Sequence, residues 1–160
     1  MLLAVLAALA VIALRLILFA MGRPPEGTDF MLVHFLAIVT IVFFTGHRAL
    51  GRDVRVPFPT LVREGFKGAA LYAILFGAFI WCYYRVAEPD HFAARVDAMV
   101  EHGVAEGQPE GVIRPKLTQF FTPFNYASIT FFALLAVSAF NALLVGAVHH
   151  KLLRRYRLNG

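Results

Sequence analysis

The sequence predicts an all-α integral membrane protein, a four-helix bundle with one further amphipathic helix outside the membrane. Three observations predict this fold. Hydrophobic residues make up 59% of the 160-residue chain and charged residues only 16%, where an average soluble domain has about 25% charged residues. The mean hydropathy is +0.69. Four long apolar stretches follow one another, and a helix needs roughly 17–25 such residues to cross a ~30 Å hydrocarbon core.

The first two apolar stretches cover residues 1–21 and 30–46. The first contains a single charge, Arg15. We interpret it as an uncleaved spanning helix, because a cleaved signal peptide has a basic leading segment and a shorter apolar run. The second stretch contains His34 and lies at the short end of the spanning range.

The third and fourth predicted spans cover residues 60–84 and 124–148. Thr60 follows two prolines and is expected to cap the third helix. Pro123 precedes the fourth, where a missing amide costs least. An aromatic group closes the third span and is predicted to lie in the outer headgroup layer: Trp81, Tyr83 and Tyr84. The 16 phenylalanines are expected to face lipid or fill gaps between helices.

The basic residues are distributed unequally between the connecting segments. Nine Lys or Arg and two acidic residues lie between spans two and three, in the first turns of span three or after span four, a net charge of +7. The remaining segments outside the spans have a net charge of −3. Because cytoplasmic segments retain Lys and Arg, both termini are predicted to be cytoplasmic. The basic face is expected to attract anionic lipid headgroups, so the overall charge of +5 requires no nucleic acid partner.

Residues 85–122 form the one long segment outside the predicted spans. A helix is expected to begin at Pro89 and to end at Gly103. Its apolar face would lie on the outer membrane surface or cap the bundle, with Asp97 and Glu101 facing water. We expect the following residues to form a turn-rich return, and a partner docking site remains an alternative to a solvated loop. The apolar face comprises Phe92, Val96, Met99 and Val100.

Polar side chains within predicted spans are the default functional candidates, because burying them in a membrane is costly. We expect Arg15 to snorkel toward the headgroups or to pair with Asp29, Glu88 or Asp90. His34 is expected to be a hydrogen-bonded helix partner rather than a ligand. Ser138 and Asn141 are expected to form hydrogen bonds across helices.

Small residues recur every four positions on spans three and four, which predicts close contact between these helices. They are Ala69, Ala73 and Gly77, and Ser138, Ala142 and Gly146. His47 and His149 end spans two and four, an arrangement that would also suit bis-imidazole haem ligation. No catalytic motif, zinc-binding spacing or phosphate loop is present, and the lone cysteine, Cys82, cannot form an internal disulfide. We therefore predict no catalytic residue, metal or cofactor.

Several short motifs accompany this order of spans: Gly65-Phe66 at the start of span three, Tyr83-Tyr84 at its end, Pro89-Asp90-His91-Phe92 at the start of the acidic helix, and a basic tail. In these features the chain from about Val5 to Arg157 resembles a bacterial family of uncharacterised four-helix inner-membrane proteins, a domain of unknown function. It lacks the basic segment that usually precedes the first span in that family. The resemblance implies an inner-membrane protein and provides no catalytic residues.

These observations lead us to expect a small non-enzymatic membrane protein, an accessory or assembly subunit of a membrane complex or a homo-oligomer. One alternative is a transporter or pore for a small solute, in which Arg15 or Asn141 would act. A second alternative is an electron-transfer subunit whose haem is held by His47 and His149.

Overall fold

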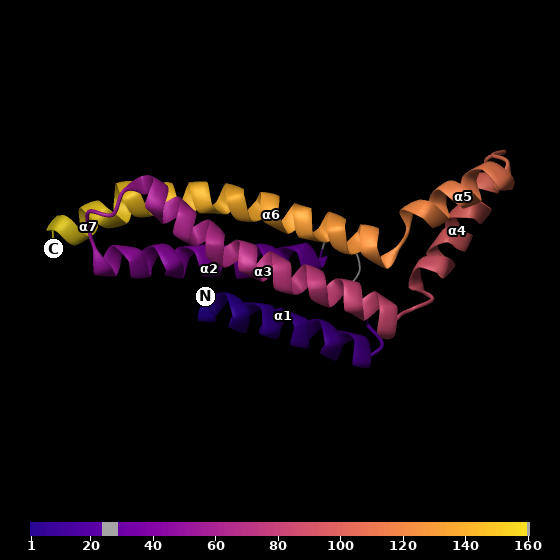
Figure 1. Ribbon diagram of the computed structural model, residues 1–160, viewed down its shortest axis with the longest axis horizontal. Helices are drawn as coiled ribbons and strands as arrows, with labels where there is room; N and C mark the ends of the chain where they lie inside the picture. Colours follow the sequence, from indigo (N-terminus) through magenta and orange to yellow (C-terminus); the bar gives the residue numbers. More distant parts are fainter. Residues whose placement is uncertain (24–28, 160) are drawn as a thin grey trace. The chain divides into compact units, whose positions relative to one another are not determined.

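The computed structural model describes residues 1–23 and 29–159, and it describes only the backbone of Asp29 and of residues 157–159. Within these ranges every regular element is a helix, which confirms the all-α prediction (Figure 1). In chain order they are α1 (Leu2–Ala20), α2 (Asp29–Arg52), α3 (Phe58–Val86), α4 (His91–Ala105), α5 (Glu110–Phe120), α6 (Pro123–Val148), a π-helical turn η1 (His149–Leu153) and α7 (Arg154–Asn159).

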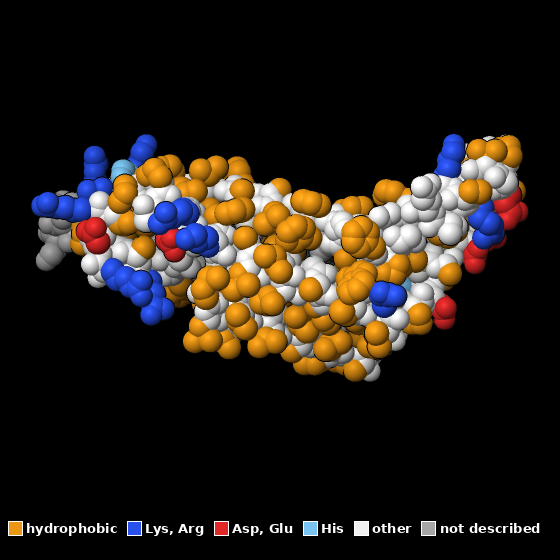
Figure 2. Space-filling view, in the orientation of Figure 1, with side chains coloured by type: hydrophobic (Ala, Val, Ile, Leu, Met, Phe, Trp, Pro, Cys, Tyr) orange, Lys and Arg blue, Asp and Glu red, His pale blue; other side chains and the backbone are white. Residues whose placement is uncertain are grey.

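Four of these helices are long and apolar enough to cross a membrane: Leu2–Ala20, Phe30–Arg52, Phe58–Val86 and Pro123–Tyr156. At about 1.5 Å per residue even the 19-residue first helix nearly covers a ~30 Å hydrocarbon core. Much of the surface of these helices is not buried within the chain, and hydrophobic side chains cover this exposed surface broadly (Figure 2). The chain is therefore a membrane protein with four candidate spans.

Several predicted helix ends differ from those in the structure. The second helix continues to Arg52 instead of ending at residue 46. Leu50, on its additional turns, is fully buried against Val56 and Leu61 and so holds these turns to the start of α3. The third helix begins at Phe58, so Thr60 lies inside its first turn and is not its cap.

The chain divides into two compact units, whose boundaries fall within α3 and α6. The first unit comprises residues 1–76 and 132–160 and contains part of all four spans. The second comprises residues 77–131, including α4 and α5.

The second unit places the aromatic residues of α3 differently from the sequence prediction. Tyr83 and Tyr84 are each only 3% exposed, whereas Trp81 is 39% exposed and lies 5.0 Å from the Arg85 guanidinium. The Tyr84 ring packs against Phe92 of α4 and Tyr126 of α6, with ring centroids 4.8 and 5.2 Å apart. The prediction of a headgroup belt is thus wrong for the two tyrosines, because their rings form part of this unit's own packing.

The segment between α3 and α6 contains two helices, where we predicted one helix and a turn-rich return. On α4, Phe92, Val96 and Val100 are buried as predicted, while Met99 is 41% exposed. Pro109 precedes the additional helix, α5, at its N-cap position. The two helices lie side by side as a hairpin (Figure 1).

Arg114 of α5 joins the two helices of this hairpin. Its guanidinium donates hydrogen bonds to Asp97 of α4 at 2.5 Å and to Glu110 of α5 at 2.8 Å. The hydrogen bond to Asp97, and to a lesser extent the one to Glu110, raises the pKa of Arg114 above its ordinary value. All three side chains are substantially exposed, so the network helps to fix the pairing of α4 with α5 more than it adds stability.

Gly103 does not end the helix as predicted. It lies buried inside α4, which continues to Ala105. A Cβ atom at Gly103 would lie 2.8 Å from Cδ1 of Ile113 on α5. The glycine therefore permits the two helices of the hairpin to pack closely.

We expect Gly103→Val to loosen this hairpin by about 1–3 kcal/mol, the usual cost of overpacking, because the branched side chain would displace Ile113. Hydrogen exchange of the α4 and α5 amides would measure the loss of protection. Gly111→Val is the matched control, since a Cβ there meets nothing within 4 Å. Equal protection in the two variants would contradict the role assigned to Gly103.

Candidate functional site

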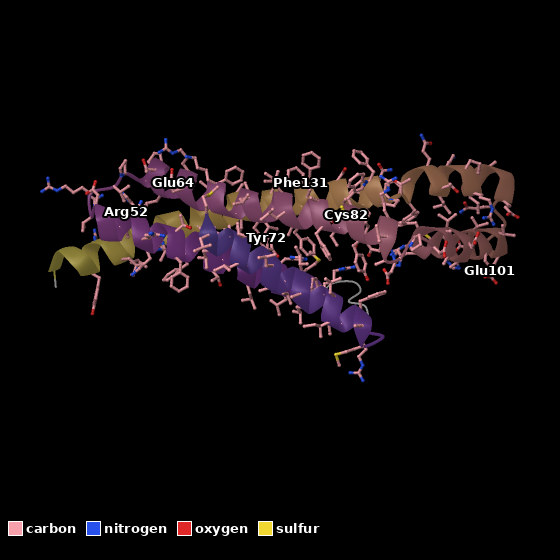
Figure 3. All side chains as sticks on the ribbon, turned by 60° about the horizontal axis from the view of Figure 1, so that its bottom comes forward. Arg52, Glu64, Tyr72, Cys82, Glu101 and Phe131 are labelled. Carbon is pink, nitrogen blue, oxygen red and sulfur yellow. The ribbon has the colours of Figure 1, made fainter. Side chains whose placement is uncertain are left out.

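The first unit contains a buried group of polar and aromatic side chains, which we call the polar cluster: Arg15, Phe30, His34, Tyr72 and Phe76. They come from α1, α2 and α3. Arg15 is 5% exposed, His34 9% and Tyr72 0%. Figure 3 labels Tyr72 part-way along α3, between Glu64 and Cys82. The cluster thus brings a permanent positive charge, an imidazole and a phenol together inside the helices.

His34 and Tyr72 form a hydrogen bond between α2 and α3 within this cluster. The distance between His34 Nδ1 and the Tyr72 hydroxyl oxygen is 2.5 Å. The edges of two aromatic rings enclose the imidazole, Phe30 at 5.1 Å and Phe76 at 4.3 Å between centroids. The prediction that His34 is a hydrogen-bonded helix partner is confirmed. Tyr72 is the partner that sequence reasoning missed.

Arg15 lies inside the cluster and is buried there. Its guanidinium carbon is 5.7 Å from the centroid of the Phe30 ring, which gives a cation–π contact between α1 and α2. The reason for its position is helical periodicity, because the buried residues of α1 are Ala4, Ala8, Val11 and Arg15, one stripe along one face. The predicted pairings with Glu88 and Asp90 stay predictions, and the Asp29 side chain lies outside the described residues.

Ser138 and Asn141 are buried on α6 but bond within their own helix. The Ser138 hydroxyl donates to the Leu134 carbonyl at 2.7 Å, and the Asn141 amide donates to the Val137 carbonyl at 2.9 Å. Each bond runs to the residue four positions earlier, where side chains of this kind compete with backbone bonds. The expectation that they bond across helices is therefore wrong for the hydrogen bonds given in the described part of the chain.

The small-residue faces of α3 and α6 meet each other, as predicted. In the first unit, a Cβ at Gly146 would lie 3.0 Å from Val62 of α3, and a Cβ at Gly65 would lie 3.9 Å from Ala142 of α6. In the second unit, a Cβ at Gly77 would lie 3.2 Å from Cβ of Phe131 on α6. Ala69, Ala73 and Ala142 are fully buried. These faces are used within the chain.

The two predicted haem ligands lie at the same level of the first unit, and each ring contacts Phe43. The His47 ring stacks on Phe43 at 6.2 Å, and the His149 ring tilts against it at 5.0 Å. His149 is fully buried, and its Nδ1 lies 2.8 Å from the Val145 carbonyl. A Cβ at Gly46 would lie 3.1 Å from three atoms of this ring. One face of the His149 imidazole is therefore covered by α2.

His149 is also the first residue of the π-helical turn η1. Such turns insert one extra residue into an α-helix and often mark functional positions. The sequence gives one signal for this contact, because Gly46 precedes His47 on α2 and leaves space for a ring. Among the described residues, no group of three or more His, Cys, Asp or Glu side chains is arranged to hold a metal ion.

Two features could have identified Tyr72 from the sequence. It is a phenol in the middle of an apolar span, and a hydroxyl in that position requires a hydrogen-bond partner. The second feature is His34, a polar residue one turn inside the end of span two, which could supply that partner.

No protein-family model, curated protein or solved structure matches this chain.

Proposed function

We propose that this chain is a small non-enzymatic protein of the bacterial inner membrane, an accessory or assembly subunit of a membrane complex or of a homo-oligomer. Both termini would be cytoplasmic, because most of the Lys and Arg residues lie in the α2–α3 connection, in the first turns of α3 and after α6. The resemblance to four-helix inner-membrane proteins supports the same location.

One observation carries this proposal: the buried polar side chains of the spans take part in packing inside the chain. His34 bonds to Tyr72, Arg15 lies over Phe30, and Ser138, Asn141 and His149 lie at hydrogen-bond distance from carbonyls of their own helix. Contacts of this kind hold the helices of the chain together, as expected of a structural subunit. What the spans present outward is apolar surface, which suits lipid or another membrane protein.

The first helix is the best candidate for a partner surface. Only 22% of its spanning window is buried inside the chain, compared with 44% for α3. Its outward side carries large apolar residues, among them Leu6, Leu9, Leu16 and Ile17. The small-residue faces of α3 and α6 are already covered, so they support packing within the chain and not the contact with a partner.

Gentle detergent extraction from the native membrane followed by native mass measurement tests this proposal. We expect a species heavier than the 17.8 kDa chain, either an oligomer or a complex with a second membrane protein. Replacing Leu9 and Leu16 by Ala should reduce that species, whereas replacing Leu143 and Leu144 of α6 should leave it intact. A strictly monomeric protein without a co-purifying partner would contradict the proposal.

A transporter or pore for a small solute is the second candidate, and the buried polar cluster favours it. Intramembrane ionisable residues commonly mark ion or proton pathways. In liposomes, Arg15→Ala or Asn141→Ala should then lower the flux of the solute. Unaltered flux in both variants would exclude these residues from a pathway.

The haem-binding alternative stays a prediction with a direct spectroscopic test. A preparation from the native membrane should show a Soret band that is lost in His149→Ala. A colourless preparation would exclude this alternative.

A further inference from the structure

The surface of the first unit has an open groove of about 450 Å³ between α3 and α6. Its lining includes Phe58, Val62, Arg63 and Phe66 of α3 and Ala139 and Leu143 of α6. All but Arg63 are apolar, and Ala139 supplies the shortest side chain. Both helices are candidate membrane spans, so the groove lies on a surface that faces the acyl chains of the bilayer.

One cationic side chain contributes to the lining of this groove. The Arg63 side chain lines it and is 64% exposed. Glu64 lies between Arg63 and Lys67, with Nε and Nζ at 3.3 and 3.2 Å from its carboxylate oxygen. Glu64 therefore neutralises one of these two charges and leaves the other in excess.

A second cation, Arg154, lies near the Phe58 part of the lining. The Phe58 ring, part of the groove lining, contacts the His150 ring at 5.9 Å between centroids. His150 Nε2 accepts a hydrogen bond of 3.3 Å from Arg154. His150 thus links Arg154 to the Phe58 part of the groove lining.

We infer that this groove is a binding site for one anionic phospholipid, with an acyl chain along Phe66, Ala139 and Leu143 and the phosphate at Arg63 and Arg154. The charges select this occupant. Arg63, Lys67 and Arg154 against Glu64 leave a net excess of positive charge, and guanidinium groups bind phosphate in a bidentate geometry. An apolar groove with cations beside it matches a lipid with an anionic head.

The surrounding surface agrees with this assignment. Lys and Arg side chains gather at the end of the first unit that carries the α2–α3 connection and α7, and hydrophobic side chains cover the helices beyond them (Figure 2). The inference goes beyond the proposed function, because it holds whether the chain acts alone or with a partner.

Native mass spectrometry of the purified full chain, titrated with phosphatidylglycerol or with phosphatidylcholine of the same acyl chains, tests this site. We expect retention of one phosphatidylglycerol and at least about fivefold weaker binding of phosphatidylcholine, the typical contribution of one basic residue near a lipid surface. Arg63→Gln should weaken phosphatidylglycerol binding by about the same factor. Leu143→Trp should fill the groove and prevent binding of either lipid.

Two matched variants keep the test specific. Arg48→Gln removes an exposed charge from the last turns of α2, outside the groove lining. Leu144→Trp enlarges an exposed residue of α6 that is also outside the lining. Both should bind phosphatidylglycerol as the unmodified chain does. Ala139→Leu replaces Leu143→Trp if that variant fails to fold by circular dichroism. Equal losses in Arg63→Gln and Arg48→Gln, equal retention of the two lipids, or full binding with the groove filled would each overturn the inference.

Discussion

Tyr72→Ala should lower the free energy of unfolding by about 3–5 kcal/mol, the cost of deleting a buried aromatic side chain. Tyr72 is fully buried, bonds to His34 and packs on Phe76, so its removal leaves a cavity and an imidazole without this partner. Reversible unfolding in mixed micelles with increasing sodium dodecyl sulfate, followed by circular dichroism, would measure the change.

Two further variants separate the contributions of the ring and the hydroxyl. Tyr72→Phe keeps the ring and should cost only about 0.6–1.7 kcal/mol, the measured range for hydrogen bonds between membrane helices. Phe140→Ala removes a side chain that is 60% exposed on α6, and it should cost far less than Tyr72→Ala. If Tyr72→Ala were no more destabilising than Phe140→Ala, the polar cluster would not be part of the core.

Gly146→Leu should separate α3 from α6 and cost about 1–3 kcal/mol or more, as overpacking does in a well-packed interior. A Cβ alone would lie 3.0 Å from Val62 Cγ2, 3.5 Å from the Phe58 ring and 3.6 Å from the Val62 backbone nitrogen. The isobutyl group of leucine extends further in the same direction. The same detergent titration would measure the loss of stability.

Gly146→Ala and Gly111→Leu complete this series. The alanine variant should be nearly neutral, because the gain of up to ~1 kcal/mol in helix propensity offsets a small displacement of Val62. Gly111 lies on α5, where an added Cβ would have open space for 4 Å around it, so Gly111→Leu should not destabilise the chain. Equal stability of the Gly146→Leu and Gly111→Leu variants would show that Gly146 is not needed for helix contact.

Hydropathy sufficed to predict the all-α class and the four long helices, because each apolar run is long and nearly free of charge. It did not predict where the helices end. The extra turns of α2 depend on Leu50 packing against Val56 and Leu61, which is a tertiary contact. The helix α5 was missed because Pro109, Pro115 and the glycines at 107 and 111 indicated turns. The bonds of Arg114 to Asp97 and Glu110, which support this helix, are contacts that the pattern of turn residues does not reveal.

The candidate site was predicted in part. Arg15 and His34 were identified because ionisable residues are rare in spans, and the contact between α3 and α6 followed from the spacing of their small residues. Composition could not show that Tyr72 faces His34, since their pairing depends on how far α2 and α3 are rotated about their axes. The same reason explains Tyr83 and Tyr84, whose amphipathic rings suit either a headgroup layer or a packed interior.

The most direct test of the account is on which side of the membrane three segments lie: the acidic helix α4, the basic α2–α3 connection and the basic C-terminal segment. In a Cys82→Ser background, single cysteines at Glu101→Cys, Arg52→Cys and Tyr156→Cys would be exposed to a membrane-impermeant thiol reagent on intact cells. We predict labelling of Glu101→Cys without permeabilisation, and labelling of the other two only after it. Labelling of Arg52→Cys or Tyr156→Cys on intact cells would contradict four spans with both termini in the cytoplasm.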